Sequence, residues 1–539
     1  MNRRSSTKRS SCCKRSTRKS AELRGSLPCS MESRFFRWHA RRPRQRIGCH
    51  MMMRYVLTLL LAVGVFDANA QGDSGAVTAR KARVENGLLQ PVAVRGAPVH
   101  AMRLAERMQA LNVPGVSIAV INAGAVEWSG SYGIANARTG RPVTSGTLFQ
   151  VASIGKPVAA LVAVRLAAEG KIDLDEDVNR RPRQWQVPGA QPVVTARALL
   201  SHTAGMPTFG LPGYGSDAPQ PTLLQVLAGS RPATNPPVTM DTPVGGRYAY
   251  SSLGYVVLEQ YLNDATGRPF GVLADETVFA PLGMRDTLYA QSLPPALATR
   301  AASGHAADGS VVAGNWRAYP ELAAAGLWST AHDLAQFALA VQRAASGQDG
   351  QLITQQQARA MLTPVRGSYG LGFELDHAAA EPAFHHSGSN AGYKALLFAY
   401  ERTGQGAVIL ANGDNGWMLI EEIARSIAAE YGWEDYRPRK RVAAQPNVAL
   451  LARFAGDFAV SNTTLRVSHE NGHLYIAGPP VGPVPVELIP AGDYDYFMRE
   501  KDATLHFDNS GDGRIQTLTF VDGRPRKGTR LAEAVPRVD

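Results

Sequence analysis

The stretch FQVASIGK, residues 149–156, decides how this chain is interpreted. Its serine and lysine, Ser153 and Lys156, are three residues apart, and residues at that spacing share one face of a helix. An amine can then lie against a hydroxyl, which is the arrangement that activates a serine nucleophile. Apolar residues follow at helical spacing and end at Gly170, which predicts a helix directly after Ser153. The same Ser-x-x-Lys spacing also occurs at Ser5–Lys8, Ser11–Lys14 and Ser16–Lys19, so the pattern alone proves little.

Two later segments support an enzymatic interpretation. They are Tyr250-Ser251-Ser252 and His386-Ser387-Gly388-Ser389. Serine acyl transfer requires a nucleophile, a base, a proton donor to the leaving group and an oxyanion hole. A lysine serves as the base only if burial or nearby cations lower its pKa towards neutrality. A tyrosine can share or relay the proton. Two alternatives stay open: Tyr250 as an ordinary buried strand tyrosine, and His385 in place of His386 in the cleft.

Taken together, these segments resemble the motifs of the serine β-lactamase and penicillin-binding protein family. The resemblance is to the branch of class C β-lactamases, DD-peptidases and esterases, which has Ser-x-x-Lys, Tyr-x-Asn and Lys/His-Thr/Ser-Gly in this order. Four further signatures agree: LLSHTAGMP at 199–207, PLGM at 281–284, GLWST at 326–330 and YGLGF at 369–373. The resemblance covers roughly residues 95–435. It implies an α/β (α+β sandwich) penicillin-recognising serine hydrolase domain with a helical subdomain.

The resemblance also implies a role for each matching residue. Ser153 would be the acylated nucleophile, Lys156 its general base, and Tyr250 the group that activates the serine or protonates the leaving group. Ser252, His386, Ser387 and Gly388 would contact the substrate. The backbone N–H groups of Ser153 and Ser389 would form the oxyanion hole. The family performs this chemistry without a metal or a cofactor, and His202 of the LLSHTAGMP segment is expected to fix a loop.

Two positions depart from the family pattern. Ser252 stands where the second motif usually has asparagine, and a hydroxyl cannot offer both an amide donor and a carbonyl acceptor. His386 stands where many members have lysine. A histidine is charged only when protonated, so we expect it to anchor a substrate carboxylate in a pH-dependent way. Both departures disfavour a dedicated β-lactamase.

The basic charge of the chain is confined to its first residues. Residues 1–70 hold 16 Lys and Arg against 3 Asp and Glu, a net of +13, so the remainder carries −1 of the total of +12. The near-neutral remainder gives no support to a nucleic-acid partner. Residues 53–70 combine a basic start, an apolar run and Ala-Asn-Ala, which predicts a secretory signal peptide cleaved after Ala70. Residues 1–52 are then a basic leader upstream of a start at Met53.

We therefore expect a periplasmic or secreted protein, with membrane contact only through the signal segment if it stays uncleaved as an anchor. All four cysteines precede residue 50, so the mature chain has no disulfide framework. Residues 71–95 are small and polar and are interpreted as a linker to the catalytic domain at 96–435. A second linker is expected at 436–449, before an all-β barrel at 450–535. In the barrel, Asn471-Gly472 predicts a hairpin.

The run Asp508–Ile515 imitates the start of a calcium loop, but its flanks are typical of strands, and a hairpin turn is the better interpretation. No His, Cys, Asp or Glu cluster has convincing metal spacing.

The sequence as a whole predicts an exported serine hydrolase that acts on a small-molecule or peptide substrate through an acyl-enzyme, like a DD-peptidase, D-aminopeptidase or esterase. The alternatives are a true β-lactamase, or a non-catalytic penicillin-binding or ligand-sensing protein.

Overall fold

The computed structural model describes residues 74–532, apart from 182–183, 190–192, 349–351, 379–380, 480, 510 and 512–513. The leader predicted for residues 1–52 and the signal peptide predicted for 53–70 lie outside the described residues. Within the described part of the chain, no helix is both long and apolar enough to cross a membrane.

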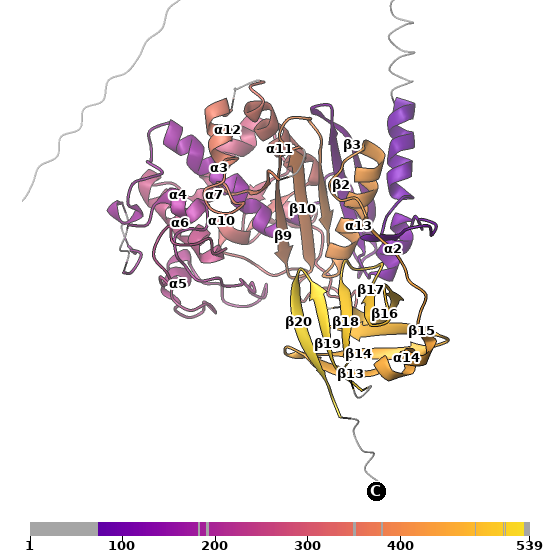
Figure 1. The fold of residues 1–539 in the computed structure, drawn as a ribbon. Coiled ribbons are helices and arrows are strands. Elements are labelled where there is room, and N and C mark those ends of the chain that lie inside the picture. Colours follow the sequence, from indigo (N-terminus) through magenta and orange to yellow (C-terminus); the bar gives the residue numbers. More distant parts are fainter. Residues whose placement is uncertain are drawn as a thin grey trace, which may run out of the picture. The chain divides into compact units, whose positions relative to one another are not determined.

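A seven-stranded antiparallel sheet lies at the centre of the domain that carries the motifs (Figure 1). Its order is β4-β3-β2-β11-β10-β9-β8, so strands from the two ends of the domain meet in the middle. The bounds are β2 Gly115–Asn122, β3 Ala125–Asn136, β4 Arg141–Pro142, β8 Glu374–Asp376, β9 Ala383–Asn390, β10 Tyr393–Tyr400 and β11 Gly406–Ala411.

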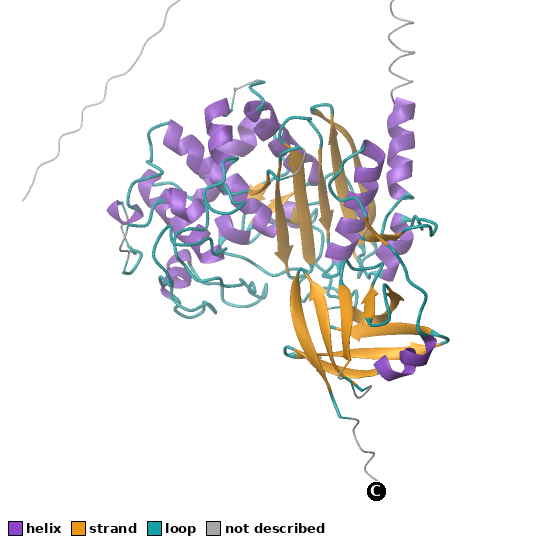
Figure 2. Cartoon of the chain, in the orientation of Figure 1, coloured by secondary structure: helices purple, strands orange, loops and turns teal. Residues whose placement is uncertain are grey.

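Helices cover both faces of this sheet (Figure 2). Successive side chains of a strand point to opposite faces. Leu397 of β10 therefore joins the core under α3 (Gly155–Ala168) and α11 (Ala331–Ala345), whereas Leu396 joins the core under α13 (Gly416–Tyr431). The helix predicted after Ser153 is confirmed as α3. The α2 helix (Leu104–Ala110) packs on the α13 side.

The remaining helices of this domain come mostly between β3 and β8 in the sequence and form the helical subdomain. They are η1 Ala152–Ile154, η2 Val178–Arg180, α4 Ala196–Leu200, α5 Leu223–Ala228, α6 Ser252–Thr266, α7 Phe270–Ala274, η3 Asp275–Phe279, α8 Ala280–Leu282, α9 Pro295–Ala298, α10 Leu322–Ala325 and α12 Gln355–Met361. A small three-stranded sheet precedes and supports the Ser153 segment. Its strands, in spatial order, are β5 (Phe149–Gln150), β7 (Leu327–Ser329) and β6 (Leu288–Tyr289). Residues 207–246 are loops apart from α5, as their proline and glycine content predicts.

The linker predicted for residues 71–95 is wrong in its described part. Residues 74–85 form a helix, and Val84 and Leu88 are fully buried in the core under α13. Strand β1 (Val92–Val94) pairs in parallel with β12 (Arg439–Arg441), so the second predicted linker also contains a strand. Small and polar composition concealed the helix, because only a few apolar side chains are needed to bury one helical face.

The C-terminal residues form a closed eight-stranded barrel, which confirms the predicted all-β module. The α14 helix (Val448–Phe454) contributes to its core, where the Phe454 ring stacks on Phe507 at 4.3 Å between centroids. The predicted hairpin at Asn471-Gly472 is confirmed, because the strands on its two sides pair. The strands predicted on both sides of the calcium-like run are also confirmed. Within that run, Ser510, Asp512 and Gly513 lie outside the described residues. The strands are β13 Gly456–Val460, β14 Thr463–Glu470, β15 His473–Gly478, β16 Gly482–Pro490, β17 Asp495–Phe497, β18 Thr504–Asn509, β19 Ile515–Asp522 and β20 Arg524–Arg530.

Candidate active site

Ser153 lies in a tight turn between β5 and α3. The turn is anchored where the Val151 N–H donates to the Leu327 carbonyl, at 3.1 Å. Ala152 has a φ of +50°, in the left-handed region that non-glycine residues seldom adopt. Such local strain persists only where the surroundings enforce it, and it is common at functional sites. The Ser153 side chain is half-buried, so it faces a partly open space at the start of α3.

Lys156 is the second residue of α3, three residues after Ser153, and it is fully buried. Its Nζ lies 2.9 Å from Ser153 Oγ and 2.8 Å from the Ala324 carbonyl oxygen. Burial disfavours the ammonium form and lowers the pKa of Lys156 to about 7. Because a carbonyl oxygen only accepts, one N–H of the neutral amine points to Ala324 and its lone pair can face the Ser153 hydroxyl. The structure therefore brings together the predicted nucleophile and base.

Tyr250 lies in the loop immediately before α6, so the alternative of an ordinary strand tyrosine is wrong. Its ring centroid is 5.0 Å from Lys156 Nζ. Burial raises the pKa of Tyr250 to about 12, and a side-chain hydrogen bond with Ser153 acts in the opposite direction. The hydroxyl therefore stays protonated at neutral pH and can donate. Ser252 is the half-buried first residue of α6, and its contact with a substrate stays a prediction.

His202 fixes the Tyr250 loop, as predicted. The Ser251 N–H donates to His202 Nδ1 at 3.1 Å, and the Ala249 N–H donates to the His202 carbonyl at 2.9 Å. The His202 ring also lies against the Tyr250 ring, 4.3 Å between centroids. His202 of the signature segment at 199–207 therefore holds the loop that carries Tyr250 through these hydrogen bonds and this ring contact.

His386, rather than His385, lies beside the other motif residues. It points to the α3 face of β9 and its ring centroid is 6.2 Å from that of Tyr250, whereas His385 faces Glu374 at 3.9 Å on the opposite face. His386 Nδ1 is 2.7 Å from the Ser387 carbonyl, and Nε2 is 3.1 Å from the Tyr369 hydroxyl. We assign the proton to Nδ1, so that Nε2 of the neutral ring accepts from Tyr369.

The expected pH-dependent anchoring of a carboxylate by His386 is wrong. The side chain is only 1% exposed, and burial, together with the nearby positive charge of Lys156, lowers the pKa of His386 to about 3. The ring is therefore neutral throughout the physiological range. The sequence pattern identified the residue but not its charge, because its charge depends on burial among residues far apart in the chain.

Gly388 has a packing role in the structure, and its predicted contact with a substrate stays a prediction. A Cβ at this position would lie 2.1 Å from the Val151 carbonyl oxygen, so glycine lets β9 pack directly on the Ser153 turn. Ser387 and Ser389 point to the other face of β9 and are half-exposed and exposed. The oxyanion hole formed by the N–H groups of Ser153 and Ser389, and the substrate contact of Ser387, stay predictions.

Sequence reasoning missed several buried residues that hold this arrangement. Asn390 donates through Nδ2 to Gln150 Oε1 at 2.8 Å and to the Ala325 carbonyl at 3.2 Å, which ties β9 to β5 and to α10. The alternation of His386, Gly388 and Asn390 along one face of β9 is the signal that could have found it. The α10 helix, which supplies the Ala324 carbonyl, was missed because it is one turn long.

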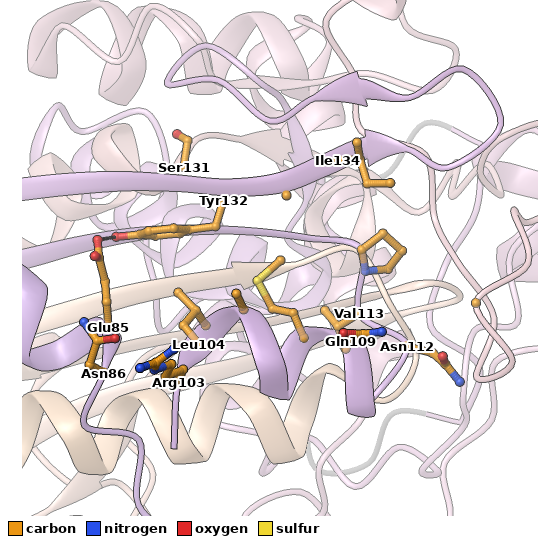
Figure 3. A pocket seen from close by; sticks show the side chains of 15 residues that line it. Glu85, Asn86, Arg103, Leu104, Gln109, Asn112, Val113, Ser131, Tyr132 and Ile134 are labelled. Atoms are coloured by element: carbon orange, nitrogen blue, oxygen red, sulfur yellow. Dashed lines mark hydrogen bonds between the residues drawn. The ribbon is translucent and has the colours of Figure 1, made fainter. Parts of the chain in front are cut away.

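A separate pocket of about 810 Å³ lies between α2 and β3 and contains none of the motif residues (Figure 3). Apolar side chains such as Leu104 and Met108 line it, and at one end the Tyr132 hydroxyl donates to Glu85 at 2.8 Å. No group of three or more potential metal-ligand side chains occurs among the residues that the structure describes.

Comparisons with known proteins identify the family of this chain. A family model described as Beta-lactamase matches residues 101–430. A stretch of 184 residues, 32% of this chain and 46% of the other, is 33% identical to the esterase EstB of Burkholderia gladioli. A longer match, 74% of this chain and 91% of the other, is 23% identical to a penicillin-binding protein of Bacillus subtilis.

A solved structure has the same fold. The octameric penicillin-binding protein homologue from Pyrococcus abyssi aligns with a TM-score of 0.55 and 19% identity over 79% of this chain and 98% of that one. The fold, the site and the relatives together define a serine hydrolase of the β-lactamase and DD-peptidase type. The chain belongs to the β-lactamase family, which confirms the resemblance read from its motifs.

Proposed function

We propose that this protein is an exported hydrolase that forms an acyl-enzyme at Ser153 and then hydrolyses it, cleaving an amide or an ester. The observation that carries the proposal is the 2.9 Å contact between Ser153 Oγ and the buried Lys156 amine, whose pKa burial lowers to about 7. A neutral amine beside a hydroxyl is the requirement for general-base activation of serine.

In the first step, Lys156 Nζ accepts the proton of Ser153 Oγ while Oγ attacks the substrate carbonyl. The resulting tetrahedral oxyanion accepts hydrogen bonds from the N–H groups of Ser153 and Ser389. The bond to the leaving group then breaks, and the Tyr250 hydroxyl donates a proton to the departing nitrogen or oxygen and is reprotonated from the Lys156 ammonium. A water molecule attacks the ester in the second step, its proton returns to Ser153 Oγ, and the acid is released.

The substrate that fits best is one whose binding does not require a positive charge at position 386. His386 is neutral above a pH of about 3, so it offers no positive charge to a substrate carboxylate. Ser252 likewise lacks the amide group that would pair with an amide in the side chain of a substrate. We therefore favour short esters and amino-acid amides over β-lactams and peptides that end in a free carboxylate. The similarity to an esterase over part of the chain supports the same choice.

Covalent labelling tests the proposal. The full chain is expressed with its leader, purified, and treated with a fluorophosphonate and with a fluorescent penicillin, beside the Ser153→Ala variant. We expect fluorophosphonate labelling of the wild type at Ser153 and none of the variant. Labelling that persists in Ser153→Ala would overturn the nucleophile assignment. Failure of both probes to label the wild type would instead support a non-catalytic binding protein.

Export is tested on the same preparation. We expect the mature protein to begin at Gln71 and to be recovered from the periplasm or the medium of a bacterial host. Intact-mass analysis measures the cleavage position. An N-terminus far from residue 71 would contradict the predicted cleavage site, and it would leave the acyl-enzyme proposal untouched.

A further inference from the structure

Two buried carboxyl groups near the site have no part in the chemistry proposed above. Glu259 of α6 is 3% exposed, and Glu321, which precedes α10, is 1% exposed. Burying a carboxyl group is costly unless it makes hydrogen bonds that compensate for lost water. Neither residue belongs to the motifs that identified the family. Their position next to α10 therefore calls for a physical explanation.

The contacts of Glu259 lead directly to the general base. The Ala323 N–H, in the first turn of α10, donates to Glu259 Oε2 at 2.9 Å. At the other end of the same single turn, the Ala324 carbonyl accepts from Lys156 Nζ at 2.8 Å. The next carbonyl, that of Ala325, accepts from Asn390 at 3.2 Å. The α10 turn is thus held at its start by a carboxyl group and contacts Lys156 at its end.

A helix of four residues has no stability of its own, because one turn does not repay the entropy of fixing its dihedral angles. Its position must come from side chains that bind it. Leu322 to Ala325 have apolar side chains, so the directional polar contacts of this turn are made by its backbone groups. The polar contacts of Glu259, Lys156 and Asn390 then determine where the Ala324 carbonyl lies.

We infer that Glu259 is a positioning residue for Lys156, which it holds in the reactive orientation through α10. This inference rests on the proposed function, since it assumes that Lys156 is the base of Ser153. Glu259 fixes the α10 backbone, the Ala324 carbonyl takes one N–H of Lys156, and the Lys156 lone pair is left to face Ser153. An α10 turn that shifts would rotate the amine away from the serine.

The role of Glu259 depends on the length of its side chain and on its acceptor oxygen rather than on its charge. Burial raises its pKa to about 8, with a smaller contribution from Glu321, whose own pKa burial raises to about 7. Tyr289, the other titratable side chain that interacts with Glu259, is also buried and has its pKa raised. At pH 7 the carbonyl oxygen of a mostly neutral acid accepts from α10. A glutamine has the same length and the same acceptor.

Two substitutions at Glu259 distinguish the effect of side-chain length from the effect of charge. Glu259→Gln keeps the reach and the acceptor but cannot ionise, whereas Glu259→Asp can ionise but is one methylene shorter. We expect Glu259→Gln to retain the wild-type kcat and pH profile. We expect Glu259→Asp to lower kcat for a chromogenic ester by about 10- to 100-fold, as for a reacting group misplaced by roughly 1 Å, with little change in KM.

Glu422 provides a matched control. It is also a buried helical glutamate, 5% exposed, but it pairs with Arg107 on the α13 side of the sheet. We expect Glu422→Asp to lower the Tm without lowering kcat. The inference is overturned if Glu259→Asp retains full kcat, if Glu259→Gln loses as much as Glu259→Asp, or if Glu422→Asp shows the same loss of kcat.

The rate of fluorophosphonate labelling distinguishes this failure from failure of the proposed function. Wild-type protein that is never labelled at Ser153 contradicts the proposed function itself. Wild type and Glu259→Asp that are labelled at equal rates contradict only the role of Glu259. We expect Glu259→Asp to reach full labelling slowly, because Ser153 is intact and only its activation is impaired.

Discussion

The pKa of Lys156 makes a quantitative prediction about the rate of acylation. An ordinary lysine, with a pKa of 10.5, is neutral in roughly 1 molecule in 3,000 at pH 7. With a pKa of about 7, about half of the Lys156 side chains are neutral at that pH. Because only the neutral amine accepts the Ser153 proton, kcat/KM should rise tenfold per pH unit below pH 7 and level off above pH 8. At pH 5 it should be roughly 50-fold lower than at pH 7.

The assay is the second-order rate of fluorophosphonate labelling between pH 4 and pH 9, with the Tm recorded at each pH to exclude unfolding. Two variants identify the titrating group. Lys156→Arg keeps a positive charge that cannot be lost, and we expect no labelling. Glu321→Gln removes another group whose pKa is about 7 and should leave the midpoint in place. A flat profile, or a midpoint that moves only in Glu321→Gln, would refute the assignment of Lys156 as the base.

Three further predictions concern the groups around this pair. Tyr250→Phe should lower kcat by about 10²- to 10⁴-fold, the usual contribution of a positioned proton donor, without lowering the Tm; steady-state kinetics and thermal unfolding measure both. Gly388→Ala should destabilise the fold by about 1–3 kcal/mol, because its Cβ would overlap the Val151 carbonyl, and denaturant unfolding measures this loss. His202→Asn keeps a hydrogen-bond acceptor near the Ser251 N–H, and asparagine tolerates the φ of +56° at this position. His202→Phe keeps only an aromatic ring against Tyr250. We expect His202→Asn to retain a higher kcat than His202→Phe. Equal losses in the two His202 variants would show that the hydrogen bond is not what positions the loop.

The sequence predicted those parts of the structure that depend on local patterns. Helical spacing of the apolar residues after Ser153 identified α3. Three short segments, taken in their order along the chain, predicted one site for Ser153, Lys156, Tyr250 and His386, and these residues lie close together in the structure. Turn residues such as Asn471-Gly472 located a hairpin, since both need a left-handed backbone.

The parts that the sequence did not predict depend on contacts between distant residues. The helix at 74–85 gains its stability from a core supplied by α13, which no window of local sequence contains. The α10 turn is a run of apolar residues with no side-chain capping hydrogen bond, and Glu259, Lys156 and Asn390 bind its backbone from distant parts of the chain. The neutral state of His386 follows from burial at the junction of β9 with the helical subdomain.

Burial is the largest cause of the charge states in this site. Burial moves Lys156, His386 and Glu259 towards their neutral forms, since it disfavours whichever form is charged. A second lysine in place of His386 would add a positive charge next to Lys156, and electrostatic repulsion could then help to lower the pKa of Lys156. With a neutral histidine that help is absent, and burial is the cause that lowers this pKa. Under the proposed function, the close packing of β9, α6 and α10 around Lys156 is what activates Ser153, and residues that maintain this packing should affect catalysis without touching the substrate.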